Sequence, residues 1–328
     1  MENPWLWFIG SVILVVYAAI KLSHYASIIS AKSSLGGFWV GSALLAGATS
    51  LPEVVASVTS GIMGLPDIAV GNVFGSNIFN LANIALMDII KGGTPILALA
   101  SAGHIMSATL GMVLSALAAV AILLKSNISI FGVGIDTIII IGVYAIGLKA
   151  MASYSKGEGS EEGEGPKAYQ GASLKKAYLG FGIGALVVMV AGTALTISGD
   201  EIARITGLGG TFVGSILIAA STSLPETVAG ITAVRMGAIN LALGNFFGSN
   251  IFNMIILFIS DMALRGAPIL SVVGPVHAVT ALFGLILSGV AIMGLLVKSK
   301  KKILGMGVDS ATILGLYIFV TYLLFKGI

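Results

Sequence analysis

The sequence has no cysteine and very few charged residues. The absence of cysteine excludes disulfides, thiol catalysis and thiolate metal sites. Charged residues make up 9% of the 328 residues, whereas a soluble domain carries about 25%. Hydrophobic residues make up 57%, and the mean hydropathy is +1.04. So few charges cannot cover a surface that faces water, and the lipid bilayer is therefore the expected environment.

The sequence also lacks a strong net charge, and its first apolar run does not resemble a removable leader. The net charge is only +3, and the basic residues lie in loops rather than in one patch, which argues against nucleic acid as a partner. The first apolar run begins at Trp5, with no basic segment before it and no clear cleavage site. We interpret it as a retained helix rather than a signal peptide.

Long apolar segments follow one another along the chain. A helix that spans a membrane needs about 20 apolar residues, and this criterion predicts an all-α integral membrane protein with ten transmembrane helices. A polar segment at 153–173, rich in Gly and Glu, is expected to be a flexible linker between 1–152 and 174–328. The predicted spans are 4–24, 36–62, 67–90, 101–124, 130–150, 174–198, 209–234, 239–263, 270–297 and 304–325.

Lys and Arg are distributed unevenly between the two sides of these spans. If the N-terminus is outside, thirteen of the 17 basic residues fall on the inner side, and four fall on the outer side. Cytoplasmic loops carry the excess of Lys and Arg in membrane proteins. This predicts a multi-pass protein of the prokaryotic cell (inner) membrane with both termini outside and the linker in the cytoplasm.

The two halves of the chain repeat each other at a constant offset of 173 residues. GATSLPEVVAS at 47–57 aligns with ASTSLPETVAG at 220–230, and GNVFGSNIFN at 71–80 aligns with GNFFGSNIFN at 244–253. Each half contains five predicted spans, an odd number, so the second half enters the membrane from the opposite side. This predicts the inverted five-helix repeat of secondary transporters, with a binding site near the midplane.

Each repeat places one glutamate in the middle of a span, directly after a proline. Pro52 precedes Glu53, and Pro225 precedes Glu226. Proline removes a helical hydrogen bond and frees a carbonyl, and freed carbonyls beside a carboxylate form the all-oxygen environment that Ca²⁺ prefers. The alternative is a capping box that only restarts a kinked helix. A charge at the bilayer centre costs at least about 2.5–3.5 kcal/mol, which favours an ion site.

A polar stripe follows in the next span of each repeat. Residues four positions apart lie on one face of a helix. Direct contact with an ion is expected for the last two members of each stripe, and support of the glutamates for the first; hydrogen bonding between helices is the alternative. The stripes are Asn72, Ser76 and Asn80 in the first repeat and Asn245, Ser249 and Asn253 in the second.

Other polar residues are expected to have structural roles. Asp88 and Asp261 lie near Lys91 and Arg265 at span ends, where interfacial pairing is expected. Asp136 and Asp309 resemble caps at helix starts, and His104 and His277 resemble satisfied interfacial histidines.

The paired motifs TSLPE and GNxxGSNIFN, present twice, resemble the two α-repeats of the calcium/cation antiporter superfamily, and most of all its prokaryotic sodium/calcium exchanger branch. The resemblance covers essentially the whole chain. It implies that Glu53 and Glu226 share Ca²⁺ and also contact Na⁺. It further implies ligands from the carbonyls of Ala46, Thr49, Ala219 and Thr222 and from the hydroxyls of Ser76 and Ser249, with Ser50, Pro52, Ser223 and Pro225 in support.

One position departs from the pattern of some sodium/calcium members, which carry Asp where this chain has Asn253. Two carboxylates provide a charge of −2, which one Ca²⁺, two Na⁺ or two H⁺ would neutralise. The sequence therefore predicts a secondary antiporter that exchanges Ca²⁺ for Na⁺ by alternating access, needs no cofactor and works as a monomer. The alternative is an H⁺-coupled exchanger of Ca²⁺ or another divalent cation. A passive channel and an intramembrane enzyme are less favoured, because strong binding impedes conduction and no nucleophile–base pair is apparent.

Overall fold

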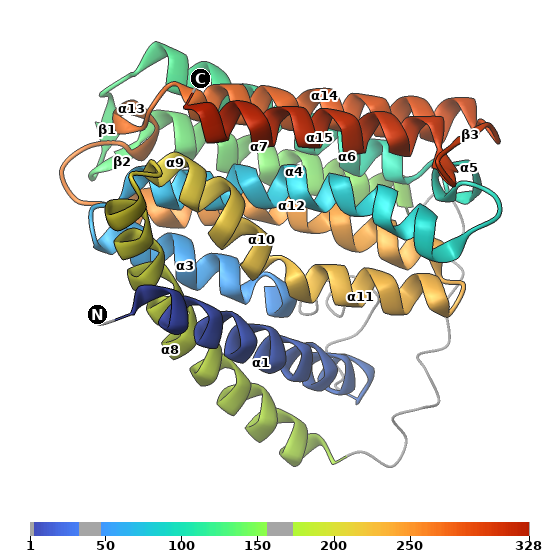
Figure 1. The fold of residues 1–328 in the computed structure, drawn as a ribbon, viewed down its shortest axis with the longest axis horizontal. Helices are drawn as coiled ribbons and strands as arrows, with labels where there is room; N and C mark the ends of the chain where they lie inside the picture. Colours follow the sequence, from blue (N-terminus) through green and yellow to red (C-terminus); the bar gives the residue numbers. More distant parts are fainter. Residues whose placement is uncertain (1–2, 33–46, 156–172, 328) are drawn as a thin grey trace.

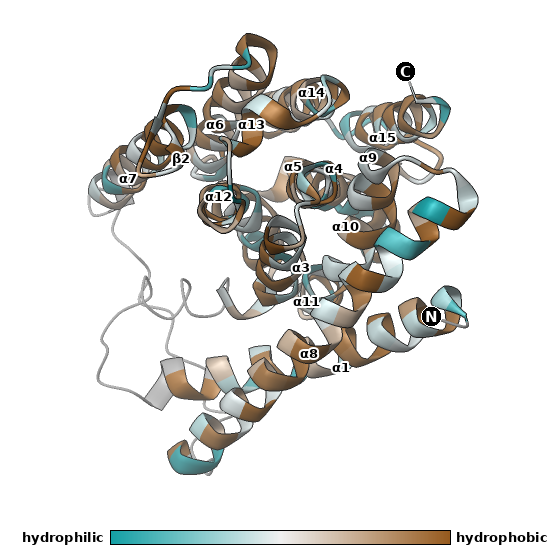
Figure 2. Cartoon of the chain, turned by 90° about the vertical axis from the view of Figure 1, so that its left-hand side faces the viewer, coloured by the Kyte–Doolittle hydropathy of each residue, from teal (hydrophilic) through white to brown (hydrophobic). Residues whose placement is uncertain are grey.

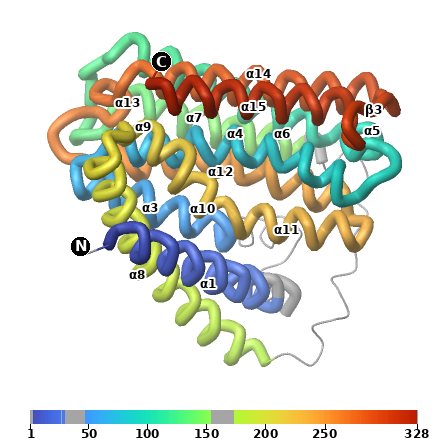
Figure 3. Tube along the Cα trace, in the orientation of Figure 1, coloured from blue at the N-terminus to red at the C-terminus, as the bar shows by residue number. Residues whose placement is uncertain are grey.

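The structure is a computed structural model, and it describes residues 3–32, 47–155 and 173–327. It is mostly helical, and the long helices run roughly along one direction (Figure 1). Figure 3 follows the chain through the same view and shows that both of its ends lie toward the left-hand side. Most of the predicted linker, and the first part of predicted span 36–62 with Ala46, lie outside the described residues.

The described residues of the first half form the following helices and strands. These are α1 (Pro4–Lys32), α3 (Leu51–Ile62), α4 (Pro66–Lys91), α5 (Ile96–Leu99), α6 (His104–Leu124), β1 (Ser129–Ile130), β2 (Val133–Gly134) and α7 (Ile135–Ser155).

The second half follows the same order. It contains α8 (Leu174–Thr206), α9 (Gly210–Phe212), the π-helix η2 (Val213–Ile218), α10 (Ala219–Thr222), α11 (Leu224–Arg235), α12 (Ile239–Ala263), α13 (Ile269–Val272), α14 (Val276–Val297), β3 (Lys302–Ile303), β4 (Met306–Gly307) and α15 (Val308–Lys326).

Eight of the described helices are long and apolar enough to cross a membrane: α1, α4, α6, α7, α8, α12, α14 and α15. The segments Gly210–Thr222 and Leu224–Arg235, which meet at a bend of 43°, meet the same criterion together and count as a ninth span if the bent pair crosses as one. The apolar helix α3 is the described part of predicted span 36–62. A multi-pass membrane protein is therefore confirmed, and the predicted number of ten spans stays a prediction.

Some predicted boundaries were wrong. Helix α1 continues to Lys32 rather than ending at 24, α7 continues to Ser155 into the predicted linker, and α8 continues to Thr206 rather than ending at 198. The extra turns of α8 include Glu201 and Arg204, which pair at 3.2 Å on one face of the helix. Such an i,i+3 pair makes charged residues compatible with a helix end.

Two helices form the centre of the bundle. In the apolar stretch of α4, 78% of the residues are buried, whereas in that of α7 only 11% are buried. Helix α12 packs against α4. Helix α6 packs against α12, and α14 packs against both α4 and α6. Figure 2 shows that the outer helices consist largely of hydrophobic residues. Helices α1 and α8 pack along each other on one side of the bundle (Figure 1). Any group held between α4 and α12 is therefore shielded from both water and lipid.

Asp88 and Asp261 have a different role from the predicted interfacial pairing. Asp261 accepts hydrogen bonds from Ile269 N at 2.6 Å, from Gly134 N at 2.8 Å and from Thr137 Oγ1 at 2.6 Å. Asp88 likewise accepts from Ile96 N at 2.6 Å and from Gly307 N at 2.8 Å. Both carboxylates are buried, and each fastens a short helix and a β-hairpin to the end of a central helix.

The predicted caps Asp136 and Asp309 lie in the first turns of α7 and α15 rather than at the N-cap position, which is Gly307 in α15. Asp136 Oδ1 accepts from Thr137 N at 2.7 Å, and Asp309 Oδ1 accepts from Ser310 N at 2.8 Å. These carboxylates satisfy amide groups that the first turn of a helix leaves without a partner.

Candidate cation site

The two glutamates follow breaks in the helices that carry them. Ser50 and Ser223 stand at the breaks with φ, ψ of −87°, 7° and −88°, 6°, outside the helical values. Helices α3 and α11 restart there with proline in the first turn, the position where a missing N–H does no harm. Glu53 and Glu226 therefore lie in the first turn of the helix that follows each break.

Each glutamate is held by the serine of the other motif. Ser50 Oγ donates to Glu226 Oε1 at 3.0 Å, and Ser223 Oγ donates to Glu53 Oε1 at 2.8 Å. The side chains of Glu53 and Glu226 are 1% and 0% exposed. The two motifs, far apart in the sequence, thus bind each other reciprocally, serine to glutamate. This brings the two carboxylates together.

The first asparagine of each polar stripe contacts the backbone of its own glutamate. Asn72 Nδ2 donates to Glu53 O at 3.2 Å, and Asn245 Nδ2 donates to Glu226 O at 3.3 Å. Asn72 also accepts from Thr222 Oγ1 at 3.1 Å. These amides fasten α4 and α12 to the helix breaks.

The last asparagine of each stripe belongs to a pair of amides between α4 and α12. Asn80 Nδ2 donates to Asn250 Oδ1 at 3.0 Å, and Asn253 Nδ2 donates to Asn77 Oδ1 at 2.8 Å. The sequence analysis assigned no role to Asn77 and Asn250. Their place one residue after each stripe serine, in the same repeated motif, is the signal that could have found them.

Several buried oxygens have no hydrogen-bond partner in the part of the chain that the structure describes. They are Glu53 Oε2, Glu226 Oε2, Asn80 Oδ1, Asn253 Oδ1 and Ser76 Oγ. Buried polar atoms are normally paired, and leaving a buried charge unpaired costs several kcal/mol. Carboxylate, amide and hydroxyl oxygens are the ligands that hard cations prefer. The arrangement suits a desolvated metal cation.

The structure also describes the other predicted ligands, with the exception of Ala46. Ser249 Oγ accepts from Ser50 Oγ at 3.4 Å, and Thr49 and Thr222 are buried. The carbonyl of Ala219 already accepts from Ser223 N at 3.0 Å and from Thr222 Oγ1 at 3.2 Å. Ala46 lies outside the described residues.

No basic residue compensates the two acids from within the surrounding segments. The sequence has no Lys or Arg between Lys32 and Lys91 or between Arg204 and Arg235. Among the described residues, no group of three or more His, Cys, Asp and Glu gathers in one place. The site therefore rests on two carboxylates and neutral oxygens. A multi-span bundle with such a centre defines a membrane protein that handles cations.

The sequence profile of the family described as sodium/calcium exchanger protein matches residues 3–148 and 176–326. The chain belongs to this family, which is one of transporters rather than enzymes. The inner membrane protein YrbG of Escherichia coli strain K12 is 27% identical over an aligned length of 266 residues, and the match covers 76% of each chain.

Two solved structures have the same fold. The H⁺/Ca²⁺ exchanger CAX matches with a TM-score of 0.74 and 16% identity, over 99% of this chain and 85% of that chain. The sodium–calcium exchanger NCX_Mj matches with a TM-score of 0.62 and 20% identity, over 97% of both chains. At these identities the likeness concerns the fold.

Proposed function

We propose that the protein is a secondary antiporter that exchanges Ca²⁺ for Na⁺, and that Glu53 and Glu226 bind both ions in turn. The observation that carries the proposal is the pair of fully buried carboxylates, each with one oxygen lacking a hydrogen-bond partner among the described residues. Calcium and sodium are the ions in the name of the family and in that of NCX_Mj.

The exchange follows from the charge of the site. Two carboxylates without a compensating cation are costly to enclose in a medium of low dielectric constant. One Ca²⁺ or two Na⁺ neutralise the charge of −2, so either cargo permits the loaded carrier to change conformation. The two ions compete for the same oxygens, and the empty site impedes the return step. This coupling makes the protein an exchanger rather than a leak.

The proposed mechanism is alternating access in an inverted-repeat scaffold with ten spans. Repeats 1–152 and 174–328 supply matching elements around the site, and the outer helices α1 and α8 move against the central helices. The distribution of Lys and Arg supports an orientation with both termini outside and the linker 153–173 in the cytoplasm. A single chain encloses the whole site, which supports function as a monomer.

Proton-coupled exchange of a divalent cation is the second candidate. Two protons also neutralise two carboxylates, and CAX, which has the same fold, is described as an H⁺/Ca²⁺ exchanger. The intact TSLPE motif in both repeats favours Na⁺ in this chain.

Ion gradients in liposomes distinguish these candidates. Purified protein is reconstituted in liposomes loaded with Na⁺, which are diluted into Na⁺-free buffer that contains radioactive Ca²⁺. Na⁺/Ca²⁺ antiport predicts Ca²⁺ uptake only with the Na⁺ gradient. Uptake driven by a pH gradient alone would establish the second candidate, and uptake without any counter-gradient would indicate a channel.

A further inference from the structure

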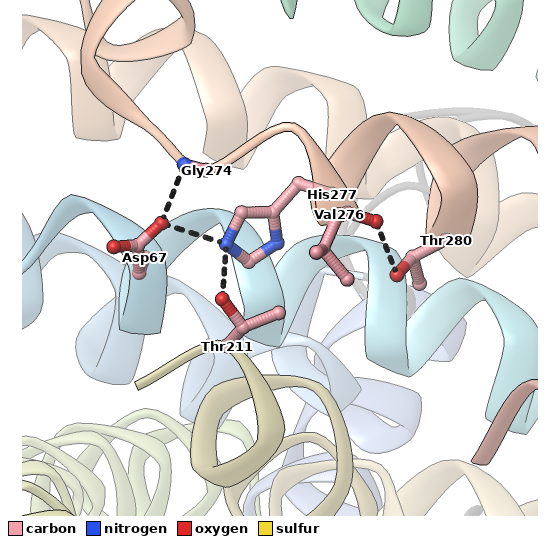
Figure 4. Close-up of polar contacts among 6 residues, drawn as sticks. All are labelled: Asp67, Thr211, Gly274, Val276, His277 and Thr280. Atoms are coloured by element: carbon pink, nitrogen blue, oxygen red, sulfur yellow. Dashed lines mark hydrogen bonds and ion pairs between the residues drawn. The ribbon is translucent and has the colours of Figure 1, made fainter. Parts of the chain in front are cut away.

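A polar cluster that is separate from the carboxylates joins three helical segments at one end of the bundle (Figure 4). Asp67 in the first turn of α4 accepts from Gly274 N at 2.9 Å, and its Oδ1 lies 3.0 Å from His277 Nε2 at the start of α14. Thr211 Oγ1 in α9 lies 3.3 Å from the same nitrogen. On the topology of the proposed function, this end faces the outside.

The partners determine which way the hydrogen bonds run. An ionised carboxylate only accepts hydrogen bonds, so His277 Nε2 carries the hydrogen and shares it between Asp67 and Thr211. His277 is 0% exposed, and its Nδ1 has no hydrogen-bond partner among the described residues. Nε2 alone therefore ties this ring to its surroundings. Thr280, also drawn in Figure 4, donates to Val276 O within α14.

The segment that Thr211 anchors is the first half of a bent span. Residues Gly210–Thr222 precede the 43° break and include the π-helix η2. This half packs on α4 at backbone distance, because a Cβ at Gly214 would lie 2.7 Å from Ile68 O, and one at Gly75 would overlap the carbonyl oxygen of Ser215. Apolar side chains of the two segments also pack together, among them Ile68 of α4 and Val213 of η2. Thr211, at the start of this half, adds a polar contact with His277 of α14.

The inner end of the bundle carries a related cluster with two differences. Asn240 accepts from Ser101 N at 2.8 Å and lies 3.3 Å from His104 Nε2. These residues and those of the outer cluster are 173 positions apart in sequence, so Asn240 replaces Asp67. The position that corresponds to Thr211 is Phe38, whose side chain has no hydrogen-bonding group. Neither the carboxylate of Asp67 nor the hydroxyl of Thr211 therefore has a chemical counterpart at the matching position of the sequence.

We propose that Asp67, His277 and Thr211 form a latch on the outer side only. It holds the first half of the broken span, Gly210–Thr222, against α4 and α14 and so keeps the outer side of the carrier closed. They act as positioning residues, because none of them touches the carboxylates. The charged hydrogen bond of Asp67 fixes His277, and His277 in turn holds Thr211. The empty carrier is thereby biased towards the state that opens to the cytoplasm. The direction rests on the proposed topology.

A single introduced cysteine reports on this movement, since the chain has none of its own. Ser215 lies one turn after Thr211, is 2% exposed and has no side-chain hydrogen bond among the described residues. Intact cells that express the full-length Ser215→Cys protein are treated with a membrane-impermeant thiol reagent in medium free of Na⁺ and Ca²⁺. The rate of labelling measures how often the outer side opens.

Thr211→Val keeps the shape of the side chain and removes its hydroxyl group. The latch predicts that labelling of Ser215→Cys becomes faster by about threefold, the factor expected for one weak neutral hydrogen bond. Asp67→Asn keeps the acceptor and removes the charge, and it should have an effect in the same direction. Thr211→Ser retains the hydroxyl and should restore the slow rate. His104→Gln in the inner cluster is the matched control and should leave the rate unchanged.

Equal labelling rates in the parent, Thr211→Val and Asp67→Asn proteins would overturn the latch, as would a rise of the same size in His104→Gln. If Thr211→Val does not fold, the labelling rate of Asp67→Asn tests the latch instead. Labelling is read without any transported ion. A latch that fails while Na⁺-driven Ca²⁺ uptake persists is therefore distinguished from a failure of the proposed function.

Discussion

Replacement of Gly75 by alanine should destabilise the protein through one identifiable contact. An added Cβ would overlap the carbonyl oxygen of Ser215 on the facing π-helix. The obstructing atom belongs to the backbone, so no change of rotamer relieves the overlap, and the two helices have to separate. Overpacking of this kind costs about 1–3 kcal/mol. A loss of 2 kcal/mol changes the ratio of folded to unfolded protein by about 30-fold.

The matched control is Gly142→Ala in α7, where an added Cβ meets nothing within 4 Å. Alanine is a better helix former than glycine by about 1 kcal/mol, so this change should be neutral or stabilising. Thermal unfolding of both variants in the same detergent measures the difference. The reasoning about the contact between α4 and η2 is wrong if Gly75→Ala unfolds at or above the temperature of Gly142→Ala.

Two further changes test other contacts. Asp261→Ala leaves the backbone N–H groups of Gly134 and Ile269 without their acceptor, each at a cost of about 1–3 kcal/mol, while Thr137 Oγ1 keeps the carbonyl of Gly134. Its unfolding temperature should fall far more than that of Arg204→Ala, which removes only an exposed ion pair, and equal losses would contradict the anchoring role. Asn72→Ala removes the amide that joins Glu53 O, Ser57 Oγ and Thr222 Oγ1. It should lower Na⁺-driven Ca²⁺ uptake at least about tenfold, because misplacement of a ligand by about 1 Å is enough for such losses. Full uptake by the folded variant would show that Asn72 does not support the site.

Hydrophobicity alone predicts the central helices well. The predicted spans 67–90 and 239–263 agree with α4 and α12 to within a residue, because long apolar runs bounded by Pro, Gly and charged residues have few other structures open to them. The break at each glutamate was also predictable, since proline cannot continue a helix.

Other features depend on tertiary contacts that a residue count does not detect. Predicted spans 130–150 and 304–325 begin inside β-hairpins, while the helices begin at Ile135 and Val308. The first hairpin turns at Phe131 and Gly132, with φ of 52° and 84°, although its residues are as apolar as a span. Asp261, remote in sequence, accepts from Gly134 N and fixes this hairpin against the end of α12.

The candidate site was predictable in its chemistry and not in its connections. The repeated motifs indicated Glu53 and Glu226 as central acids. Which serine holds which glutamate depends on how the two broken spans cross, and the exchange of Ser50 and Ser223 between them has no local signal. The π-helix η2 is a similar case, since its contact with α4 requires Gly71 and Gly75 from another part of the chain.

The central claim is that Glu53 and Glu226 hold the transported cation. Binding of radioactive Ca²⁺ to purified protein in Na⁺-free detergent solution tests it most directly, in the parent, Glu53→Gln, Glu226→Gln and the matched control Glu201→Gln, whose carboxylate belongs to a surface ion pair. The account predicts saturable binding that Na⁺ displaces in the parent and in Glu201→Gln, and its loss in both central variants. Binding that survives unchanged in a folded Glu53→Gln or Glu226→Gln protein would contradict it.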